Sequence, residues 1–459
     1  MKKVSIGKTM MFLSSGIVAI WAAAGLQQIP NLAPFPDPSG LMETNNSNGG
    51  PIDTTGPFFQ SLGTNGRTCA TCHLPADGWT ISAAHAQARF DASLGTEPLF
   101  RTNDGSVCDH NIQTQTVAER QQAYRLLLER GLIRIALSVP NGAEFEVAAV
   151  SNPYACNEFS PLSLYRRPLP AANLRFLSGV MWDGRESSTQ TGTTPITFDN
   201  DVQALAADLT HQAVDATLGH AQATTPPTPD QQQQIVNFEM AMFLSQAVDR
   251  NAGPLDVQGA TGGPKGLPGQ SFFIGINDPL GQNPFGTPFN PTIFSLFDAW
   301  TNLTNAAKAS IVRGQTLFNS KSFQITGVGG LNDMTGTCGV CHDTPNVGNH
   351  SVAAALNIGI SDVTNPLGVD YLPVITLQNL STGEMIQTTD PGRALVTGQW
   401  ADIGKFKGPI LRGLAARAPY FHNGSAQTLS DVVKFYDTRF SIGFTDQEKT
   451  DLAAFLSAL

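Results

Sequence analysis

The sequence contains few charged residues. Asp, Glu, Lys and Arg make up 14% of the 459 residues, well below the roughly 25% that is usual, and the formal net charge is −10. No basic stripe is present, so nucleic acid is not expected as a partner. Beyond residue 26, no apolar run is long enough to span a membrane. Strand patterns are also scarce, and the best one covers residues 370–380.

The first residues have the pattern of an export signal. Three lysines, at positions 2, 3 and 8, precede an uncharged stretch from Thr9 to Leu26. Alanines at positions 22–24 follow its apolar part, as a signal-peptidase site requires. We therefore predict a signal peptide over residues 1–24 and a protein that is periplasmic or secreted. The uncharged stretch is nearly long enough to span a membrane, so an uncleaved anchor stays open as the alternative.

Cysteine is scarce too, and four of the six cysteines form two copies of one motif. The copies are Cys69, Cys72 and His73 in TCATCH, and Cys338, Cys341 and His342 in TCGVCH. This C-x-x-C-H spacing is typical of c-type haem attachment, in which two thioethers hold the porphyrin and the histidine binds the iron. A zinc site made of four cysteines would leave both histidines unexplained, and no βαβ pattern supports a thioredoxin-like pair. The sequence therefore predicts two covalently bound haem c groups.

The two remaining cysteines, Cys108 and Cys156, are predicted to form a disulfide. Free thiols rarely persist in an exported protein, and the bond would close a loop of about 50 residues. Two buried thiols are the alternative.

Hydrophobic periodicity predicts a mainly α fold. Five segments carry a helical pattern. They are residues 117–137, 201–223, 229–248, 306–320 and 445–459. Pro229 suits the first position of a helix, and Thr445 followed by Glu448 suits a capped helix start.

Segments rich in Pro, Gly and Asn suggest domain boundaries. Residues 25–58 are predicted to be a flexible linker, and residues 251–297 a Gly/Pro-rich connection. The connection separates residues 59–250 from residues 298–459. Each of these two long ranges contains one haem motif. We predict that they form an N-terminal and a C-terminal haem domain.

Two further segments, MWDGRE (181–186) and FKGPILRGLAARAPYFHNGSAQTLSDVVKFYD (406–437), add to the haem motifs. Together these residues resemble the bacterial di-haem cytochrome c peroxidase family, which includes MauG. Residues 98–165 and 253–297 fall outside the resemblance, so the chain looks like an enlarged member. The resemblance implies two cytochrome-c-like haem domains with long loop insertions. It also implies that hydrogen peroxide reacts at the N-terminal haem through a ferryl state, while the C-terminal haem transfers electrons.

The resemblance further implies roles for two aromatic residues. Trp182 would lie between the haems and relay electrons, and Tyr436 would be the sixth ligand of the C-terminal haem, where MauG also has Tyr and many peroxidases have Met. A phenolate favours Fe(III) and Fe(IV), so such a haem would hold or relay the second oxidising equivalent. Without the resemblance, both residues would be interpreted as core aromatics.

Three residues are candidates for the open face of the first haem. His85, twelve residues after His73, is either a displaceable iron ligand or a surface histidine. Gln212 falls at the position of a family Gln, whereas the family Glu position falls near Gln222, where no carboxylate stands. His220 is the nearest acid–base group, and its ordinary pKa suits proton transfer during O–O cleavage. A solvent-facing His220 is the alternative.

Family members often bind calcium between the domains through an Asn side chain. Arg167 stands at that position here and disfavours calcium, although Asn173 nearby offers a replacement. The expected electron donor is a small cytochrome c, a cupredoxin or a residue of a protein substrate. The alternative functions are a di-haem oxygenase acting on an organic substrate and a non-catalytic di-haem electron carrier.

Overall fold

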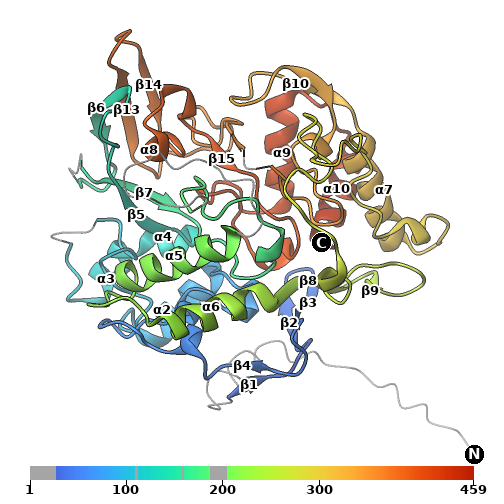
Figure 1. The fold of residues 1–459 in the computed structure, drawn as a ribbon, viewed down its shortest axis with the longest axis horizontal. Coiled ribbons are helices and arrows are strands. Elements are labelled where there is room, and N and C mark those ends of the chain that lie inside the picture. Colours follow the sequence, from blue (N-terminus) through green and yellow to red (C-terminus); the bar gives the residue numbers. More distant parts are fainter. Residues whose placement is uncertain (1–26, 109–111, 157–159, 187–203, 353) are drawn as a thin grey trace, which may run out of the picture.

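The computed structural model describes residues 27–108, 112–156, 160–186, 204–352 and 354–459 (Figure 1). The predicted signal peptide, residues 1–24, lies outside these ranges. Within them, no helix combines the length and apolar character needed to cross a membrane.

The fold mixes helices and strands, so the prediction of a mainly α class is wrong: 30% of the described residues are helical and 18% are strand. The α-helices of the described residues are α2 (Ala83–Ser93), α3 (Val117–Ala123), α4 (Arg125–Arg130), α5 (Ala204–Gly219), α6 (Pro229–Ala241), α7 (Ala306–Ser320), α8 (Ala394–Thr397), α9 (Leu429–Phe440) and α10 (Asp446–Ser457). The strands are β1 (Gln28–Ile29), β2 (Pro34–Asp37), β3 (Gly40–Asn46), β4 (Ile52–Asp53), β5 (Ile133–Leu137), β6 (Phe145–Ser151), β7 (Leu162–Arg166), β8 (Met242–Asp249), β9 (Gly253–Pro254), β10 (Phe323–Ile325), β11 (Met334–Gly336), β12 (Ala355–Leu356), β13 (Val374–Asn379), β14 (Met385–Thr388) and β15 (Phe406–Lys407).

Local capping determines where the predicted helices begin. Pro229 is the first residue of α6, directly after the N-cap Thr228. α10 begins after Thr445, whose hydroxyl oxygen accepts the backbone N–H of Glu448, while the Glu448 carboxylate accepts the backbone N–H of Thr445. These reciprocal bonds satisfy two donors that a helix start otherwise leaves unpaired. α7 matches the helix predicted over residues 306–320.

Two predicted helices end early and continue as strands. The segment 117–137 forms α3, α4 and β5, and the helix stops at Gly131, which has a left-handed φ of 60°. The segment 229–248 forms α6 and then β8, whose first six residues are all buried. A continuously buried strand has no periodicity that distinguishes it from a buried helix.

The prediction of a flexible linker over residues 25–58 is also wrong. From Gln28 onward this segment forms β1 to β4. β3 pairs antiparallel with β2 and with β8 in a sheet of order β2-β3-β8-β9, and Met42 of β3 is fully buried. The pairing partner β8 is distant in the chain, so composition near β3 could not reveal it.

A second sheet, of order β14-β13-β6, lies at the upper left of Figure 1. β13 confirms the strand predicted within residues 370–380. Its neighbour β6 belongs to the inserted segment 98–165, as do β5 and β7, which pair with each other. The insertion is therefore attached to the C-terminal half of the chain by a sheet.

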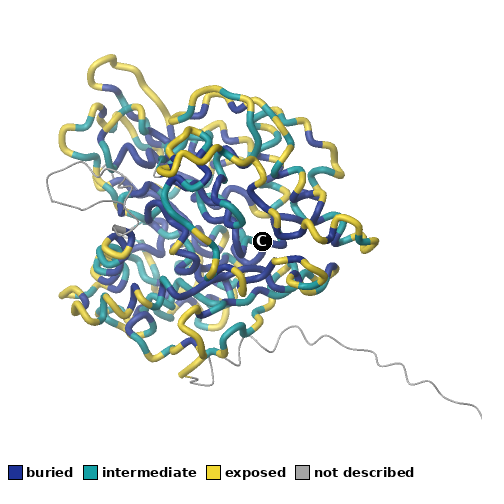
Figure 2. The backbone as a smooth tube through the Cα atoms, turned by 45° about the vertical axis from the view of Figure 1, so that its right-hand side comes forward, coloured by how far each residue is buried: buried dark blue, intermediate teal, exposed yellow. Residues whose placement is uncertain are grey.

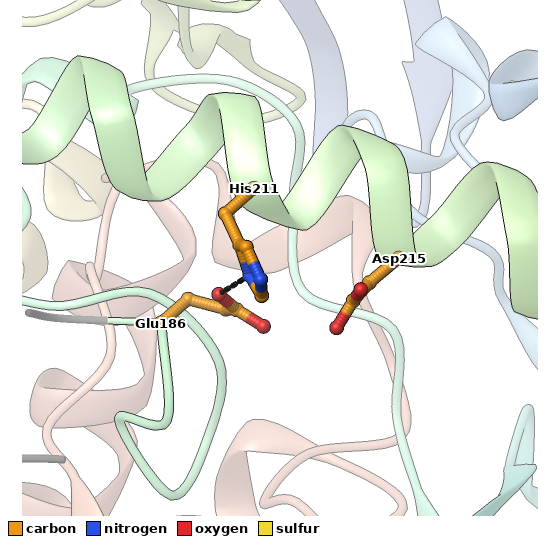
Figure 3. A group of neighbouring side chains, drawn as sticks. All are labelled: Glu186, His211 and Asp215. Atoms are coloured by element: carbon orange, nitrogen blue, oxygen red, sulfur yellow. Dashed lines mark hydrogen bonds and ion pairs between the residues drawn. The ribbon is translucent and has the colours of Figure 1, made fainter. Parts of the chain in front are cut away.

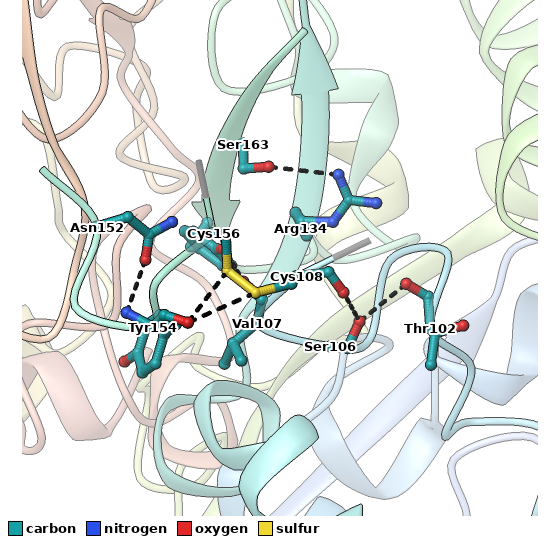
Figure 4. Close-up of a disulfide and its surroundings, with 10 residues drawn as sticks. Thr102, Ser106, Val107, Cys108, Arg134, Asn152, Tyr154, Cys156 and Ser163 are labelled. Atoms are coloured by element: carbon teal, nitrogen blue, oxygen red, sulfur yellow. Dashed lines mark hydrogen bonds between the residues drawn. A yellow bond between two sulfur atoms is a disulfide. The ribbon is translucent and has the colours of Figure 1, made fainter. Parts of the chain in front are cut away.

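The inserted segment also contains the predicted disulfide between Cys108 and Cys156 (Figure 4). Their Cα atoms are 5.8 Å apart, and 48 positions separate them in the sequence. The disulfide closes the loop that carries β5 and β6.

Buried backbone is concentrated in the middle of the molecule and exposed loops lie at its edge (Figure 2). α7 and α10 pack against each other around Phe294, Phe318 and Phe455. Leu255, from the Gly/Pro-rich connection, belongs to the same core. A separate cluster contains Trp79 and lies beside the first haem motif.

Candidate functional site

The first C-x-x-C-H motif begins with a single 3₁₀ turn over Cys69–Thr71, capped by Thr68. The turn is followed by His73, whose ring Nδ1 donates to the backbone oxygen of Trp79 at 2.9 Å. This bond fixes the ring orientation and leaves Nε2 available, which is the usual arrangement of a metal-binding histidine.

The second motif has the same local structure. A 3₁₀ turn over Cys338–Val340 follows Thr337, and His342 Nδ1 donates to the backbone oxygen of Gly348 at 2.6 Å. In both motifs the accepting carbonyl comes six residues after the histidine.

Each motif lines its own cavity. The cavity of the first motif has a volume of about 180 Å³, and that of the second about 220 Å³. The four motif cysteines are free and line these cavities together with the two histidines. Two free thiols and one oriented imidazole per cavity are the donor set that a c-type haem requires, so the residues fit one such group in each cavity.

Gln212 on α5 and His220, which directly follows the last residue of α5, line the first cavity. Gln212, Ala216 and His220 are spaced four residues apart and therefore face the same way at the end of the helix. Both residues, which the sequence suggests for the open face of the first haem, thus lie in the wall of the cavity that contains the first motif.

His220 is held by a buried carboxylate that the sequence prediction missed. Its Nδ1 donates to Asp104 at 2.5 Å, and Asp104 also accepts a hydrogen bond from Arg67. Burial alone would raise the pKa of Asp104, but the charge of Arg67 and the bond from His220 lower it. Asp104 is therefore a carboxylate, and it holds the His220 ring through Nδ1.

His85 is not among the described residues that line the first cavity. It lies on α2, and its Nδ1 is 2.6 Å from an oxygen of the buried Asp77. This hydrogen bond raises the pKa of His85. The geometry thus places His85 with Asp77 instead of beside His73.

Tyr436 lines the second cavity together with Leu429, Val432 and Val433 of the same helix, α9. This is the face predicted from the sequence, and the predicted cap of Thr428 and Asp431 is present. Burial raises the pKa of Tyr436 well above its usual range. Among the described residues, nothing forms a hydrogen bond with its hydroxyl group.

Trp182 lies in the wall that the two cavities share, because it lines both of them. Its indole Nε1 donates to the backbone oxygen of Arg167 at 2.7 Å. The ring packs edge-on against His422 at 6.1 Å between centroids, and His422 stacks on Phe406 at 3.9 Å. Aromatic rings therefore extend from the shared wall into the lining of the second cavity.

The segment around Trp182 is held to the C-terminal half by buried ion pairs. Arg166 contacts Asp183 on one side and Asp390 on the other. Burial by itself would raise the pKa of Asp183, but Arg185 and Arg166 hold it well below its usual range.

A group of three possible metal ligands lies beside Gln212 but outside the cavity lining (Figure 3). His211 Nδ1 is 2.7 Å from a carboxylate oxygen of Glu186, and Asp215 lies one helical turn further along α5. One ligand atom from each residue falls within 4.8 Å of the others. The sequence prediction did not include this group.

No protein-family model matches the chain. Over 182 residues it is 31% identical to the cytochrome-c peroxidase IdrP1 of Denitromonas iodatirespirans, which covers 36% of this chain and 44% of the relative. It is 30% identical over 184 residues to IdrP1 of Pseudomonas sp. (strain SCT), covering 36% and 43%. Over 94 residues it is 35% identical to the cytochrome c peroxidase Ccp of Escherichia coli (strain K12), covering 20% of each.

The matched regions span less than half of the length of these relatives. Among solved structures, a MauG-like protein associated with microbial copper homeostasis aligns with a TM-score of 0.37 and 15% identity, covering 88% of this chain and 87% of that one. This structural similarity is too low to decide the fold. Over the matched regions the chain is similar in sequence to bacterial cytochrome-c peroxidases, which confirms the resemblance found in its sequence.

Proposed function

We propose that the chain is a di-haem c-type peroxidase that reduces hydrogen peroxide. Cys69, Cys72 and His73 would hold the first haem, and the residues of the second motif would hold the other. The observation that carries the proposal is that the two motifs line two separate cavities with a common wall containing Trp182. We propose that this wall separates an N-terminal from a C-terminal haem domain.

A haem supplies the iron that binds peroxide and takes up its oxidising equivalents. The chain must supply the proton transfer, because heterolytic O–O cleavage moves a proton from one oxygen to the other. His220 can take this proton at Nε2 and return it, since Asp104 occupies Nδ1. Gln212 would orient the peroxide from the same face of α5.

Tyr436 is the candidate for the sixth ligand of the second haem. It lines the same cavity as His342, and no described residue satisfies its hydroxyl. Binding to iron would provide a partner for this hydroxyl group. Trp182, with His422 and Phe406, would carry electrons between the two sites.

The guanidinium of Arg167 occupies the position at which family members bind calcium. Arg167 donates to the backbone oxygens of Arg130, Gly131 and Arg417 at 3.1–3.3 Å. Carbonyl oxygens are also what a calcium ion would need. We therefore expect no calcium at this place.

The disulfide supports the proposal that the protein works outside the cytoplasm, because disulfides persist in oxidising compartments. The net charge of −10 favours an electron donor with a positive patch. A small cytochrome c or a cupredoxin fits this description, and a residue of a protein substrate is the other option.

The first test is the low-temperature EPR spectrum of the ferric protein before and after one equivalent of hydrogen peroxide. We expect one high-spin and one low-spin haem, both losing their ferric signals with peroxide. The low-spin signal should change in Tyr436→Phe and Tyr436→Met, while the high-spin signal stays. Two low-spin haems that ignore peroxide, both as isolated and after one-electron reduction, would instead support an electron carrier.

A further inference from the structure

Three buried cations lie in the shared wall, and among the described residues none of them forms an ion pair with a carboxylate, although the charge of Asp77 acts on Arg167. Arg167, Lys407 and Arg417 line both cavities, and their exposed fractions are 4%, 4% and 9%. A buried charge without a counter-charge costs much free energy, so such groups are normally paired or bound to a ligand.

Two other buried arginines that line the first cavity are paired with carboxylates, whereas the buried Arg412 donates to Ser245 and to backbone oxygens. Arg67 contacts Asp104, and Arg166 contacts both Asp183 and Asp390. Burial in this fold therefore does not by itself exclude a carboxylate partner.

Two of the three cations also have donors to spare. Among the described residues, the Lys407 amine forms no hydrogen bond, and burial lowers its pKa only to about 8, so it remains charged at neutral pH. Arg417 donates through Nε and Nη2 to backbone oxygens, whereas its Nη1 has no partner among the described residues. Arg167 is satisfied by backbone oxygens alone.

The backbone holds Lys407 at this place. Its N–H donates to the carbonyl oxygen of Trp182 at 2.8 Å, and β15, which contains it, pairs with β12. The side chain consequently belongs to the wall between the cavities and cannot leave without moving the segment around Trp182.

We propose that Lys407 and Arg417, supported by Arg167, bind the propionate carboxylates of the groups in both cavities, so that one set of cations positions two haems. The inference rests on the proposed function, since it assumes a haem in each cavity. A haem has two propionates at the porphyrin edge opposite to the thioether-forming vinyl groups.

A cation shared by two haems would affect the reduction potentials of both, whereas a cation beside one haem would affect mainly that haem. Positive charge beside a haem stabilises the reduced iron relative to the oxidised iron. Removal of Lys407 should therefore lower the reduction potentials of both haems together, whereas a change confined to one cavity should move only one of them.

The test is a spectroelectrochemical titration of holoprotein with Lys407→Gln, after the haem content of the wild type has been measured. Fewer than two haems per chain in the wild type would refute the proposed function itself. With two haems, we expect both potentials to fall by about 59 mV, which is tenfold in each one-electron equilibrium. Lys407→Arg should restore most of the shift.

Lys308→Gln is the matched control. Lys308 is also buried, but its amine bonds Gln258 and lies over Trp300, outside both cavities. Neither potential should change in this variant. If Lys407→Gln binds haem poorly, Arg417→Gln provides the same measurement on the second cation. A shift of one potential alone, or of neither, in a variant that retains two haems would overturn the shared anchor.

Discussion

The two C-x-x-C-H sites are alike where the haem would be attached and different on the opposite side. Both have a threonine before a 3₁₀ turn and a histidine bonded to the carbonyl six residues later. In both, that carbonyl belongs to a residue with positive φ, Trp79 at 60° and Gly348 at 78°. The attachment unit is therefore a repeated local structure.

The similarity extends to the turns that carry Trp182 and His422. Val180 bridges Glu186 around the first turn, and Tyr420 bridges Ala426 around the second. The residue before each aromatic ring has a φ of about 65°, 66° for Met181 and 65° for Phe421. Trp182 and His422 hence occupy equivalent places, and the internal repeat reaches beyond the haem motifs.

The opposite walls explain how equivalent attachment can serve different chemistry. The first cavity meets α5 with an amide and a histidine backed by a carboxylate, whereas the second meets α9 with a phenol among apolar side chains. A polar wall can move protons, and a phenol can bind iron. The difference between the sites is thus located in one helix each.

The largest expected effect comes from His220→Ala. Loss of a positioned acid–base group should reduce peroxidase turnover about 10²- to 10⁴-fold and leave the spectrum of the second haem unchanged. His211→Ala is the control, because His211 is the neighbouring histidine on α5 and lies outside the cavity lining. Equal turnover in both variants would show that His220 is not the acid–base group of the first site.

Asp183→Asn should break the link between the Trp182 segment and the C-terminal half. Leaving Arg166 and Arg185 without this partner should cost about 3–5 kcal/mol of unfolding free energy at neutral pH, measured by denaturant titration. The folded-state pKa of Asp183 is lowered, so its contribution is present above the unfolded value of 3.8 and is lost as pH falls below it. The variant should therefore lose less stability than the wild type between pH 5 and 3, and an unchanged acid slope would contradict this account.

Asp104→Asn should reduce peroxidase turnover less than His220→Ala does. A hydrogen bond to a charged group contributes about 1.5–3 kcal/mol, which corresponds to roughly 10- to 100-fold in turnover. Steady-state kinetics should show the loss in kcat more than in KM, because Asp104 acts on proton transfer through His220. Asp77→Asn, beside His85, is the control, and a loss of the same size there would assign the effect to general destabilisation.

The smallest expected effect tests the shared position of Trp79 and Gly348. Gly348→Ala should destabilise the second site, since a left-handed φ costs a non-glycine residue roughly 1–2 kcal/mol and the new Cβ would lie 2.8 Å from atoms of Leu411 and Phe294. Gly142→Ala is matched in φ at 76° but meets nothing within 4 Å, so it reports strain alone. Thermal unfolding should give a lower Tm for Gly348→Ala than for Gly142→Ala. The reverse order would show that the second site tolerates a side chain at this position, as the first site tolerates Trp79.

The sequence alone determined those features that depend on neighbouring residues. The two haem motifs, the starts of α6 and α10 and the face of α9 that bears Tyr436 all follow from spacings of a few residues. The disulfide followed from the number of cysteines and the expected compartment. These features need only the local geometry of the backbone or simple counting.

Only the tertiary structure decided which distant residues meet. Asp104 accepts a hydrogen bond from His220, which is 116 positions away in the sequence. β3 pairs with β8, and Lys407 lies between two cavities. No local sequence pattern predicts these long-range contacts, because they depend on how whole helices and strands pack. The mainly α prediction failed for the same reason: β3, β6 and β8 are stabilised by partner strands far away in the chain, and a buried strand shows its partner only in the folded protein.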